Sequence, residues 1–357
     1  MTALESDPGH LRYMPKLDGL RALAIGLVLL QHFGPEPFAS AIASGAVGVK
    51  LFFVLSGFLI TAVLLGLREA DMSRPEAAAR FYWRRILRLT PALYAAIAAA
   101  VLLGVGLMRQ DWWWHALYLS NVLVVVRQTF GPVGHFWTLA VEEQFYLLWS
   151  LLALFLPRRA LIPAVAGFIL LGPAYRLALA WAGVSSFAQV LLPGNIDGLA
   201  LGALLALSHR HGAVWRMLSS PWVLAASAAA AGGLLLPAAP DLARRVVFPS
   251  LVFLASASAV AIGSKAGGGA GVRWLEATIL RHIGTISYGI YVYHYFLPLI
   301  AARWVPAVAN APGPLRAGIY VAASLAVAEV SWRFLEQPIR RLRDRRPAAP
   351  ARRAEPA

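Results

Sequence analysis

The chain has 357 residues, of which 59% are hydrophobic and only 14% are charged, and its formal net charge is +15. Soluble domains carry about 25% charged residues, so this composition excludes an ordinary water-exposed globule. Cysteine is absent, which excludes disulfides, thiolate metal sites and a cysteine nucleophile. The positive charges lie in short stretches between apolar blocks, without interleaved aromatic residues, so we assign them to membrane topology and expect no nucleic-acid partner.

Apolar blocks of about 20 residues recur along the chain, and a helix of that length crosses a hydrocarbon core of about 30 Å. Because lipid offers the backbone no hydrogen-bond partners, these blocks predict an all-α polytopic membrane protein with about ten transmembrane helices. The predicted spans are 17–34, 45–67, 89–108, 137–156, 160–182, 190–207, 221–239, 246–264, 278–302 and 315–335. The Trp-rich stretch 111–126 is shorter and predicts a re-entrant or interfacial helix.

Basic residues in the loops predict the orientation of these spans. With the N-terminus in the cytoplasm, about twenty arginines and lysines fall inside and about six outside, as the positive-inside rule requires. An even number of spans then places both termini in the cytoplasm. We expect a cytoplasmic tail over 1–16, one transmembrane domain over 17–339 and a basic disordered tail over 340–357, in the inner or plasma membrane of the cell.

Charged side chains inside a predicted span are unfavourable in lipid and are therefore functional candidates. In the first span, Asp18 and Arg21 are one turn apart, and His32 lies about three turns beyond Arg21 on nearly the same face. This polar stripe predicts a face turned toward a cavity or another helix, with His32 in the outer half of the membrane. Asp18 and Arg21 also fit an interfacial pair, and His32 also fits a hydrogen-bonded core histidine.

The fourth span carries two adjacent carboxylates, Glu142 and Glu143, in its first turns. Neighbouring side chains point about 100° apart on a helix, so the two glutamates occupy different environments. The span runs inward from the outer side, which places Glu142 at a depth similar to His32. A carboxylate beside an imidazole orients it and stabilises the imidazolium, so the pair predicts a general base with its orienting group. A buried structural ion pair is the alternative.

An arginine cluster precedes the third span on its cytoplasmic side, and Arg84 and Arg88 are four residues apart on one helix face. Guanidinium groups match phosphate oxygens in bidentate pairs, so the cluster fits an anionic cytoplasmic ligand such as the phosphates of coenzyme A. Positive-inside decoration or lipid headgroup contact also fits. The sequence contains neither a His-Glu-x-x-His motif nor a phosphate-binding loop, and we expect no metal.

Seven segments, in this order, resemble the acyltransferase-3 family of membrane O-acyltransferases. They are LDGLRA (17–22) leading to His32, GVKLFFVLSGFLI (48–60), RRILRLTP (84–91), EEQFY (142–146), Asp197 before Gly202, ISYGIYVYH (286–294) and LEQP (335–338). The resemblance implies a cytoplasmic acyl-CoA donor, for which we expect acetyl-CoA, and a hydroxyl acceptor on a sugar of a cell-surface or secreted glycan.

The resemblance also implies roles for individual residues. The essential histidine of the family maps to His32, and its glutamate maps to Glu142. The arginine motif of the family maps to Arg84, Arg85 and Arg88, which are the expected donor-binding residues. We expect the oxyanion of the reaction to accept a hydrogen bond from Ser56, Tyr291 or a backbone N–H. The remaining supporting residues that we single out are Asp18, Arg21, Gln144, Tyr146 and His294.

Other functions fit part of the same pattern. The acceptor of an O-acyltransferase is alternatively a small secreted metabolite such as a macrolide. A solute or proton transporter also places ionisable residues inside the membrane, although no internal repeat is visible here. A non-catalytic scaffold that binds membrane lipids explains the span count but leaves His32 and Glu142 without a role.

Overall fold

The computed structural model describes residues 13–208, 212–265 and 270–342. These residues are predominantly helical and contain no β-strand, which confirms the all-α class. The longer helices are α1 (Pro15–Phe33), α3 (Ser44–Glu69), α4 (Arg74–Leu102), α7 (Trp137–Phe155), α8 (Arg158–Trp181), α9 (Ile196–Ser208), α11 (Pro221–Leu234), α12 (Asp241–Gly263), α13 (Thr278–Tyr293) and α16 (Gly313–Ser331). The shorter α-helices are α2 (Phe38–Ala41), α5 (Met108–Ala116), α6 (Ser120–Arg127), α10 (Ala213–Leu218), α14 (Phe296–Trp304), α15 (Pro306–Ala309) and α17 (Gln337–Arg341).

Six helical segments in the described part of the chain are long and apolar enough to cross a membrane. They are Ser44–Glu69, Arg74–Leu102, Gly134–Phe155, Arg158–Trp181, Asp241–Gly263 and Gly313–Arg341. The chain is therefore a multi-pass membrane protein, whereas the total of ten spans stays a prediction. Two predicted spans correspond to the shorter apolar helices α9 and α11. The ninth predicted span is divided, because α13 ends at Tyr293 and α14 begins at Phe296.

Helix α4 begins well before the predicted third span. A capping box starts it: the Ser73 hydroxyl accepts from the Glu76 backbone N–H, and the Glu76 carboxylate accepts from the Ser73 backbone N–H at 2.8 Å. The helix then runs for 29 residues. Arg85 and Arg88 therefore lie on continuous helix, three residues apart, and share a face.

Helix α3 lies at the centre of the molecule and packs against α1, α7, α9 and α12. Glycines allow the closest of these approaches. A Cβ atom on Gly57 would lie 1.9 Å from the Leu199 carbonyl oxygen, and one on Gly202 would lie 2.1 Å from the Val54 carbonyl oxygen. Small residues at a helix crossing permit such backbone contact in a membrane protein. Helix α3 is thereby held in place by α9 on one side.

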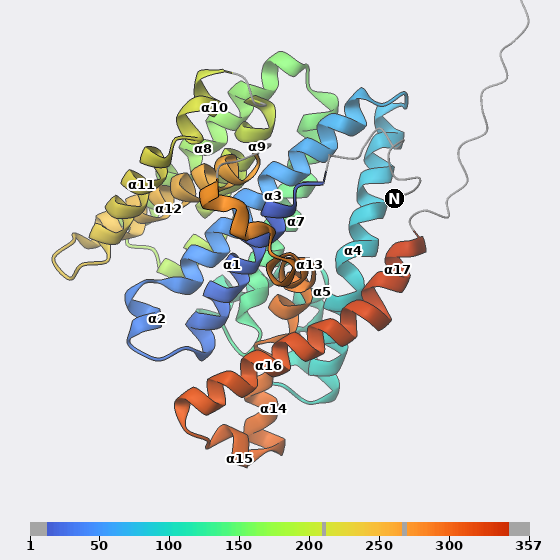
Figure 1. Cartoon of the computed structure of the whole chain (residues 1–357), viewed down its shortest axis with the longest axis vertical. Helices are drawn as coiled ribbons and strands as arrows, with labels where there is room; N and C mark the ends of the chain where they lie inside the picture. Colours follow the sequence, from blue (N-terminus) through green and yellow to red (C-terminus); the bar gives the residue numbers. More distant parts are fainter. Residues whose placement is uncertain (1–12, 209–211, 266–269, 343–357) are drawn as a thin grey trace, which may run out of the picture.

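The remaining helices form two groups around this centre (Figure 1). Helices α8 to α12 gather on one side of α3, and α4, α16 and α17 lie on the other. One buried apolar cluster forms around α3, α7, α9 and α12, and a second joins α1, α4, α13 and α16. Helices α1, α3, α4 and α7 contact both clusters and α13 belongs to the second, and these five helices line the candidate site.

The Trp-rich stretch 111–126 forms parts of α5 and α6, which have nine and eight residues. At about 1.5 Å per residue, neither helix is long enough to cross a hydrocarbon core. This agrees with a segment that does not span the membrane. Its placement at the membrane interface stays a prediction.

Candidate active site

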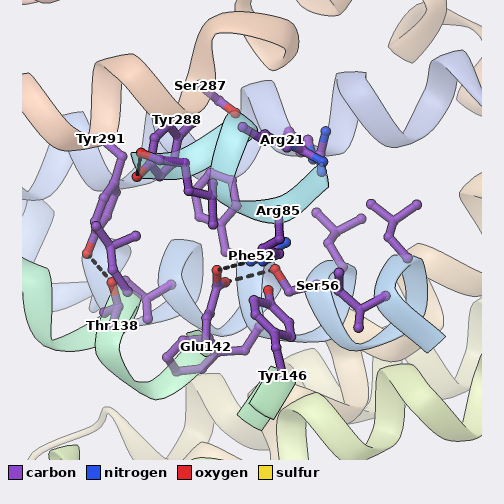
Figure 2. Close-up of a pocket in the computed structure, with 18 residues that line it drawn as sticks. Arg21, Phe52, Ser56, Arg85, Thr138, Glu142, Tyr146, Ser287, Tyr288 and Tyr291 are labelled. Atoms are coloured by element: carbon purple, nitrogen blue, oxygen red, sulfur yellow. Dashed lines mark hydrogen bonds and ion pairs between the residues drawn. The ribbon is translucent and has the colours of Figure 1, made fainter. Parts of the chain in front are cut away.

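A pocket of about 90 Å³ lies between α1, α3, α4, α7 and α13. Apolar side chains such as Phe52 and Leu139 form much of its wall. The polar groups come from different helices and converge on one region, as Figure 2 shows for Ser56, Arg85, Glu142 and Tyr146. A mostly apolar cavity with a few convergent polar groups is typical of a small-molecule site.

Glu142 is the carboxylate at the centre of this pocket. Its Oε1 atom accepts a hydrogen bond of 2.8 Å from the Ser56 hydroxyl, and its Oε2 atom lies 4.0 Å from Arg85 Nη2. The Arg85 Nε donates to Glu143 Oε1 at 2.8 Å, and the guanidinium lies 3.6 Å from the centre of the Tyr146 ring. Arg85 therefore bridges both glutamates, although only Glu142 lines the pocket.

The three predicted donor-binding arginines have different positions. Arg85 and Arg88 line the pocket, because they lie one helical turn apart on α4, whereas Arg84 is not among the lining residues. Arg21 lines the pocket from α1, and its Nη1 lies 3.4 Å from Asp18 Oδ1. In the described part of the chain, Arg88 forms no ion pair, although its charge interacts electrostatically with Glu336. The pocket thus contains two arginines, Arg21 and Arg88, that are not bound to its central carboxylates.

His32 lies in a second, aromatic environment and is not among the residues that line the pocket. Its exposed imidazole lies 5.1 Å from the His294 ring and 4.9 Å from the Tyr295 ring, measured between ring centres. The expected direct contact with Glu142 is absent from the hydrogen bonds of residues 13–208, 212–265 and 270–342, since Glu142 bonds Ser56 instead. The two predicted catalytic residues therefore occupy neighbouring regions rather than one hydrogen-bonded pair.

His135 and His294 complete this second region, which we call the histidine cluster (His32, His135, His294 and Tyr295). The rings of His135 and His294 are 5.2 Å apart, and Tyr295 stacks on His135 at 4.9 Å. His135 lies in the short helix η1 (Gly134–Phe136) before α7, and His294 follows the end of α13. No group of three or more His, Cys, Asp or Glu side chains in the described ranges is placed to hold a metal ion.

Tyr291 lies between the pocket and the histidine cluster. It lines the pocket, and its ring centre is 5.5 Å from that of His135 and 5.7 Å from that of His294. Its hydroxyl donates to the His135 carbonyl oxygen at 2.9 Å and lies 2.7 Å from the Thr138 hydroxyl. One residue of α13 thus contacts both regions, as the dashed line to Thr138 in Figure 2 indicates from the pocket side.

Two further predicted residues connect neighbouring elements. Gln144 holds α6 against α7: its Nε2 donates to the Tyr118 carbonyl at 3.0 Å, and its Oε1 accepts from Asn121 at 2.9 Å. Asp197 forms a bidentate pair with Arg176, with distances of 2.7 and 3.1 Å, and both side chains are buried. Neither residue lines the pocket, so we assign them to the scaffold.

Sequence reasoning missed His135, Thr138 and Tyr288. His135 was overlooked because the predicted fourth span begins two residues later, at position 137. An ionisable residue at the start of a predicted membrane helix was the available signal. Thr138 and Tyr288 line the pocket, but hydroxyl-bearing residues are too common in helices for their types alone to identify them.

The site geometry agrees with the result of comparison with known proteins. An acyltransferase-domain model of the acyltransferase-3 family matches residues 14–333. The chain therefore belongs to this family of membrane O-acyltransferases. No solved structure matches the chain.

Several named proteins are similar to this chain in sequence. Peptidoglycan O-acetyltransferase OatA of Listeria monocytogenes is 31% identical over 361 residues, which cover 92% of this chain and 56% of the relative. Putative peptidoglycan O-acetyltransferase YrhL of Bacillus subtilis is 30% identical over 369 residues, covering 93% and 55%. O-acetyltransferase OatA of Staphylococcus aureus is 34% identical over 166 residues, covering 42% and 26%. The chain thus spans about half the length of the first two relatives.

Proposed function

We propose that the chain transfers an acetyl group from cytoplasmic acetyl-CoA to a hydroxyl group of a cell-wall glycan. The observation that carries this proposal is the pocket in which Ser56, Arg85 and Glu142 meet beside Arg21 and Arg88, inside the acyltransferase-domain match. The names of the relatives, peptidoglycan O-acetyltransferases, support an acetyl donor and a glycan acceptor. A cavity of about 90 Å³ has room for a few water-sized groups, which suits a short acyl chain.

Arg88 and Arg21 are the proposed phosphate-binding residues for the donor. The charge of Arg85 is already compensated by Glu142 and Glu143, so it has little left to offer a phosphate. Arg88 forms no ion pair in the described part and interacts with Glu336 only without a direct bond, and Arg21 has Asp18 at 3.4 Å. Arginine forks bind phosphate oxygens in a bidentate manner. Arg85 is then a positioning residue that holds Glu142, which differs from the donor-binding role expected from sequence.

His32 is the proposed general base. It removes the proton of the acceptor hydroxyl, the alkoxide oxygen attacks the thioester carbonyl carbon, and the carbon–sulfur bond breaks. The ester product forms, and the proton passes from the imidazolium to the departing thiolate of coenzyme A. Tyr291, which contacts both regions, marks the boundary at which acetyl group and acceptor meet. Glu142 acts on the pocket side of this boundary through Ser56 and Arg85.

Tyr146 is the proposed hydrogen-bond donor to the oxyanion. Ser56 donates its hydroxyl to Glu142, and Tyr291 donates to the His135 carbonyl, so both expected donors are engaged. The Tyr146 hydroxyl is buried and belongs to a residue that lines the pocket. It lies near Glu142 and Ser56 but forms no well-aligned hydrogen bond among the described residues. A hydrogen-bond donor stabilises the negative charge that develops in the transition state most strongly when it is already in position and need not give up another partner.

The loop charges support a topology in which both termini and all donor chemistry are cytoplasmic. In that orientation, with about ten spans in the cell membrane, Arg21 belongs to the inner part of α1 and His32 to its outer end. Acetyl-CoA then enters from inside and the acceptor from outside, with Tyr291 between them. Single cysteines can be introduced into the loops of this cysteine-free chain. Labelling them with a membrane-impermeant thiol reagent then reports on which side of the membrane each loop lies.

The test of the function uses the full chain in liposomes with radiolabelled acetyl-CoA and chitopentaose, an oligomer of N-acetylglucosamine. We expect acetyl transfer to the oligomer by wild-type protein and none by His32→Ala at equal membrane insertion. Untargeted mass spectrometry of surface glycans and secreted metabolites from the matching strains identifies the natural acceptor. If only a secreted metabolite is acylated, that metabolite would replace the glycan as the proposed acceptor. Movement of a solute across the membrane without any acylated product would favour a transporter.

A further inference from the structure

Two buried ring nitrogens of the histidine cluster carry lone pairs to which no group of residues 13–208, 212–265 and 270–342 donates a hydrogen bond. The Nδ1 atom of His294 lies 2.8 Å from the Tyr291 carbonyl oxygen and 3.2 Å from that of Ile290. A carbonyl oxygen only accepts, so Nδ1 carries the hydrogen and Nε2 is the acceptor nitrogen. His135 has the opposite tautomer, because its Nε2 lies 3.3 Å from the Val292 carbonyl oxygen and Nδ1 is left as the acceptor.

Both acceptor nitrogens lack a hydrogen-bond partner in the part of the chain that the structure describes. His294 is 0% exposed and His135 is 7% exposed, so bulk water does not satisfy them. Buried polar atoms are nearly always hydrogen-bonded, and one left unsatisfied is unfavourable. Protonating them would not help, because neither ring forms an ion pair with a carboxylate of the described residues, and an isolated buried charge is still less favourable.

We propose that His135 Nδ1 and His294 Nε2 accept hydrogen bonds from hydroxyl groups of the acceptor, and so form a saccharide subsite beside His32. The inference rests on the proposed function and adds the residues that bind its acceptor. Three features point to a polyhydroxylated ligand: two acceptor nitrogens on rings 5.2 Å apart, the aromatic face of Tyr295, and the exposed His32 ring that opens the cluster to the surface. Apolar faces combined with a few fixed polar groups are typical of sites for small ligands.

This subsite explains how His32 selects one hydroxyl of the acceptor. Its ring lies 5.1 Å from that of His294 and 4.9 Å from that of Tyr295. A sugar held by two hydroxyls on His135 and His294 presents a third to His32 at a fixed position. Holding a reacting group in a fixed position lowers the activation barrier, and the rate falls steeply when the group is misplaced. His135 and His294 are therefore positioning residues for the acceptor.

The test exploits the different nitrogen that each histidine uses. Asparagine replaces the Nδ1 position and glutamine the Nε2 position. His294→Gln retains the acceptor and loses the bond to the backbone, and His294→Asn does the reverse. At His135, Asn retains the acceptor and Gln retains the bond to the Val292 carbonyl. We expect His294→Asn and His135→Gln to raise the chitopentaose KM about tenfold, the effect of a lost hydrogen bond of about 1.4 kcal/mol. His294→Gln and His135→Asn should stay within about twofold of wild type.

The acetyl-CoA KM and the rate of acetyl-CoA hydrolysis without acceptor should stay unchanged in all four variants. The matched control is His282→Gln, at an exposed histidine near the start of α13 that binds Glu329 of α16. A purely structural role predicts the reverse ranking, in which the variants that keep the backbone bond perform best, and this result overturns the proposal. Equal KM values in all four variants, or an equal rise accompanied by loss of thermal stability, also overturn it. Wild-type protein without any acetyl transfer contradicts the proposed function itself.

Discussion

The pocket around Glu142 and the histidine cluster lie side by side, but different interactions hold their side chains in place. In the pocket, Arg85 compensates two carboxylates, and Ser56 completes the hydrogen bonds of Glu142. In the histidine cluster, none of the described carboxylates forms an ion pair with a ring, and backbone carbonyls set the tautomers of His135 and His294. The pocket thus suits an anionic ligand and developing charge, whereas the histidine cluster suits neutral hydroxyl groups. This difference supports the proposal that donor and acceptor bind in separate regions that meet at Tyr291.

Loss of the base should have the largest effect. His32→Ala removes the imidazole, and we expect kcat to fall by about 10²–10⁴-fold, the usual contribution of a general base. The acetyl-CoA KM should change little, because His32 does not line the pocket. Steady-state transfer to chitopentaose measures both values. Retained kcat in a correctly inserted His32→Ala protein would remove His32 from the mechanism.

Loss of Arg85 should mainly affect stability. Arg85→Met leaves two partly buried carboxylates without their cation, and breaking a buried pair in this way costs about 3–5 kcal/mol. We expect a lower midpoint of thermal unfolding in detergent, partly restored in Arg85→Met with Glu143→Gln. Arg158→Met, which breaks an exposed pair with Glu69, should leave the midpoint unchanged. A raised acetyl-CoA KM at unchanged stability would instead make Arg85 a donor-binding residue.

Loss of the Tyr146 hydroxyl should lower the rate of the chemical step. Tyr146→Phe retains the ring beneath Arg85 and removes only the proposed oxyanion donor. We expect kcat to fall by about 10²–10³-fold with the acetyl-CoA KM nearly constant, as for other oxyanion donors. Ser56→Ala is the comparison, because its hydroxyl is bound to Glu142. A larger loss for Ser56→Ala than for Tyr146→Phe would reverse the assignment.

The smallest of these effects should be on donor binding. Arg88→Met removes a guanidinium that lines the pocket, and loss of a charge-assisted bond of about 1.5–3 kcal/mol raises the acetyl-CoA KM about 10- to 100-fold. Arg84→Met should leave this KM unchanged, because Arg84 does not line the pocket. Initial rates at varied acetyl-CoA concentration separate the two variants. Equal increases would show that both arginines bind the donor.

Much of the fold was predictable because its signals are local. The apolar blocks and the loop charges identify a helical membrane protein without any tertiary information. Element boundaries were less accurate where capping, not hydropathy, starts a helix: the capping box of Ser73 and Glu76 begins α4 about fifteen residues before the apolar stretch. The break between α13 and α14 was missed because it contains neither Gly nor Pro, and apolar and aromatic residues on both sides of His294 let the hydrophobic pattern continue across it.

The candidate site was predictable as a set of residues but not as a set of contacts. Ionisable residues in membrane helices and the ordered motifs identify His32, Glu142, Arg85 and Arg88. Their partners depend on helix packing. The spacing of Arg84 and Arg88 favoured that pair, whereas the rotation of α4 against α3 and α7 places Arg85 and Arg88 on the pocket side. The similar predicted depths of His32 and Glu142 in the membrane suggested a hydrogen bond between them. Depth alone does not say how far apart α1 and α7 lie in the plane of the membrane.

By itself, the sequence determined the helical membrane class, the membership of the acyltransferase-3 family and the residue types available for chemistry. These follow from hydropathy, charge and ordered motifs, which are properties of neighbouring residues in the chain. Only the tertiary structure decided that Glu142 bonds Ser56 and Arg85, and that His32 lies with His135 and His294. The reason is that a hydrogen bond requires a separation of about 3 Å, and only the packing of α1, α3, α4, α7 and α13 brings distant residues that close.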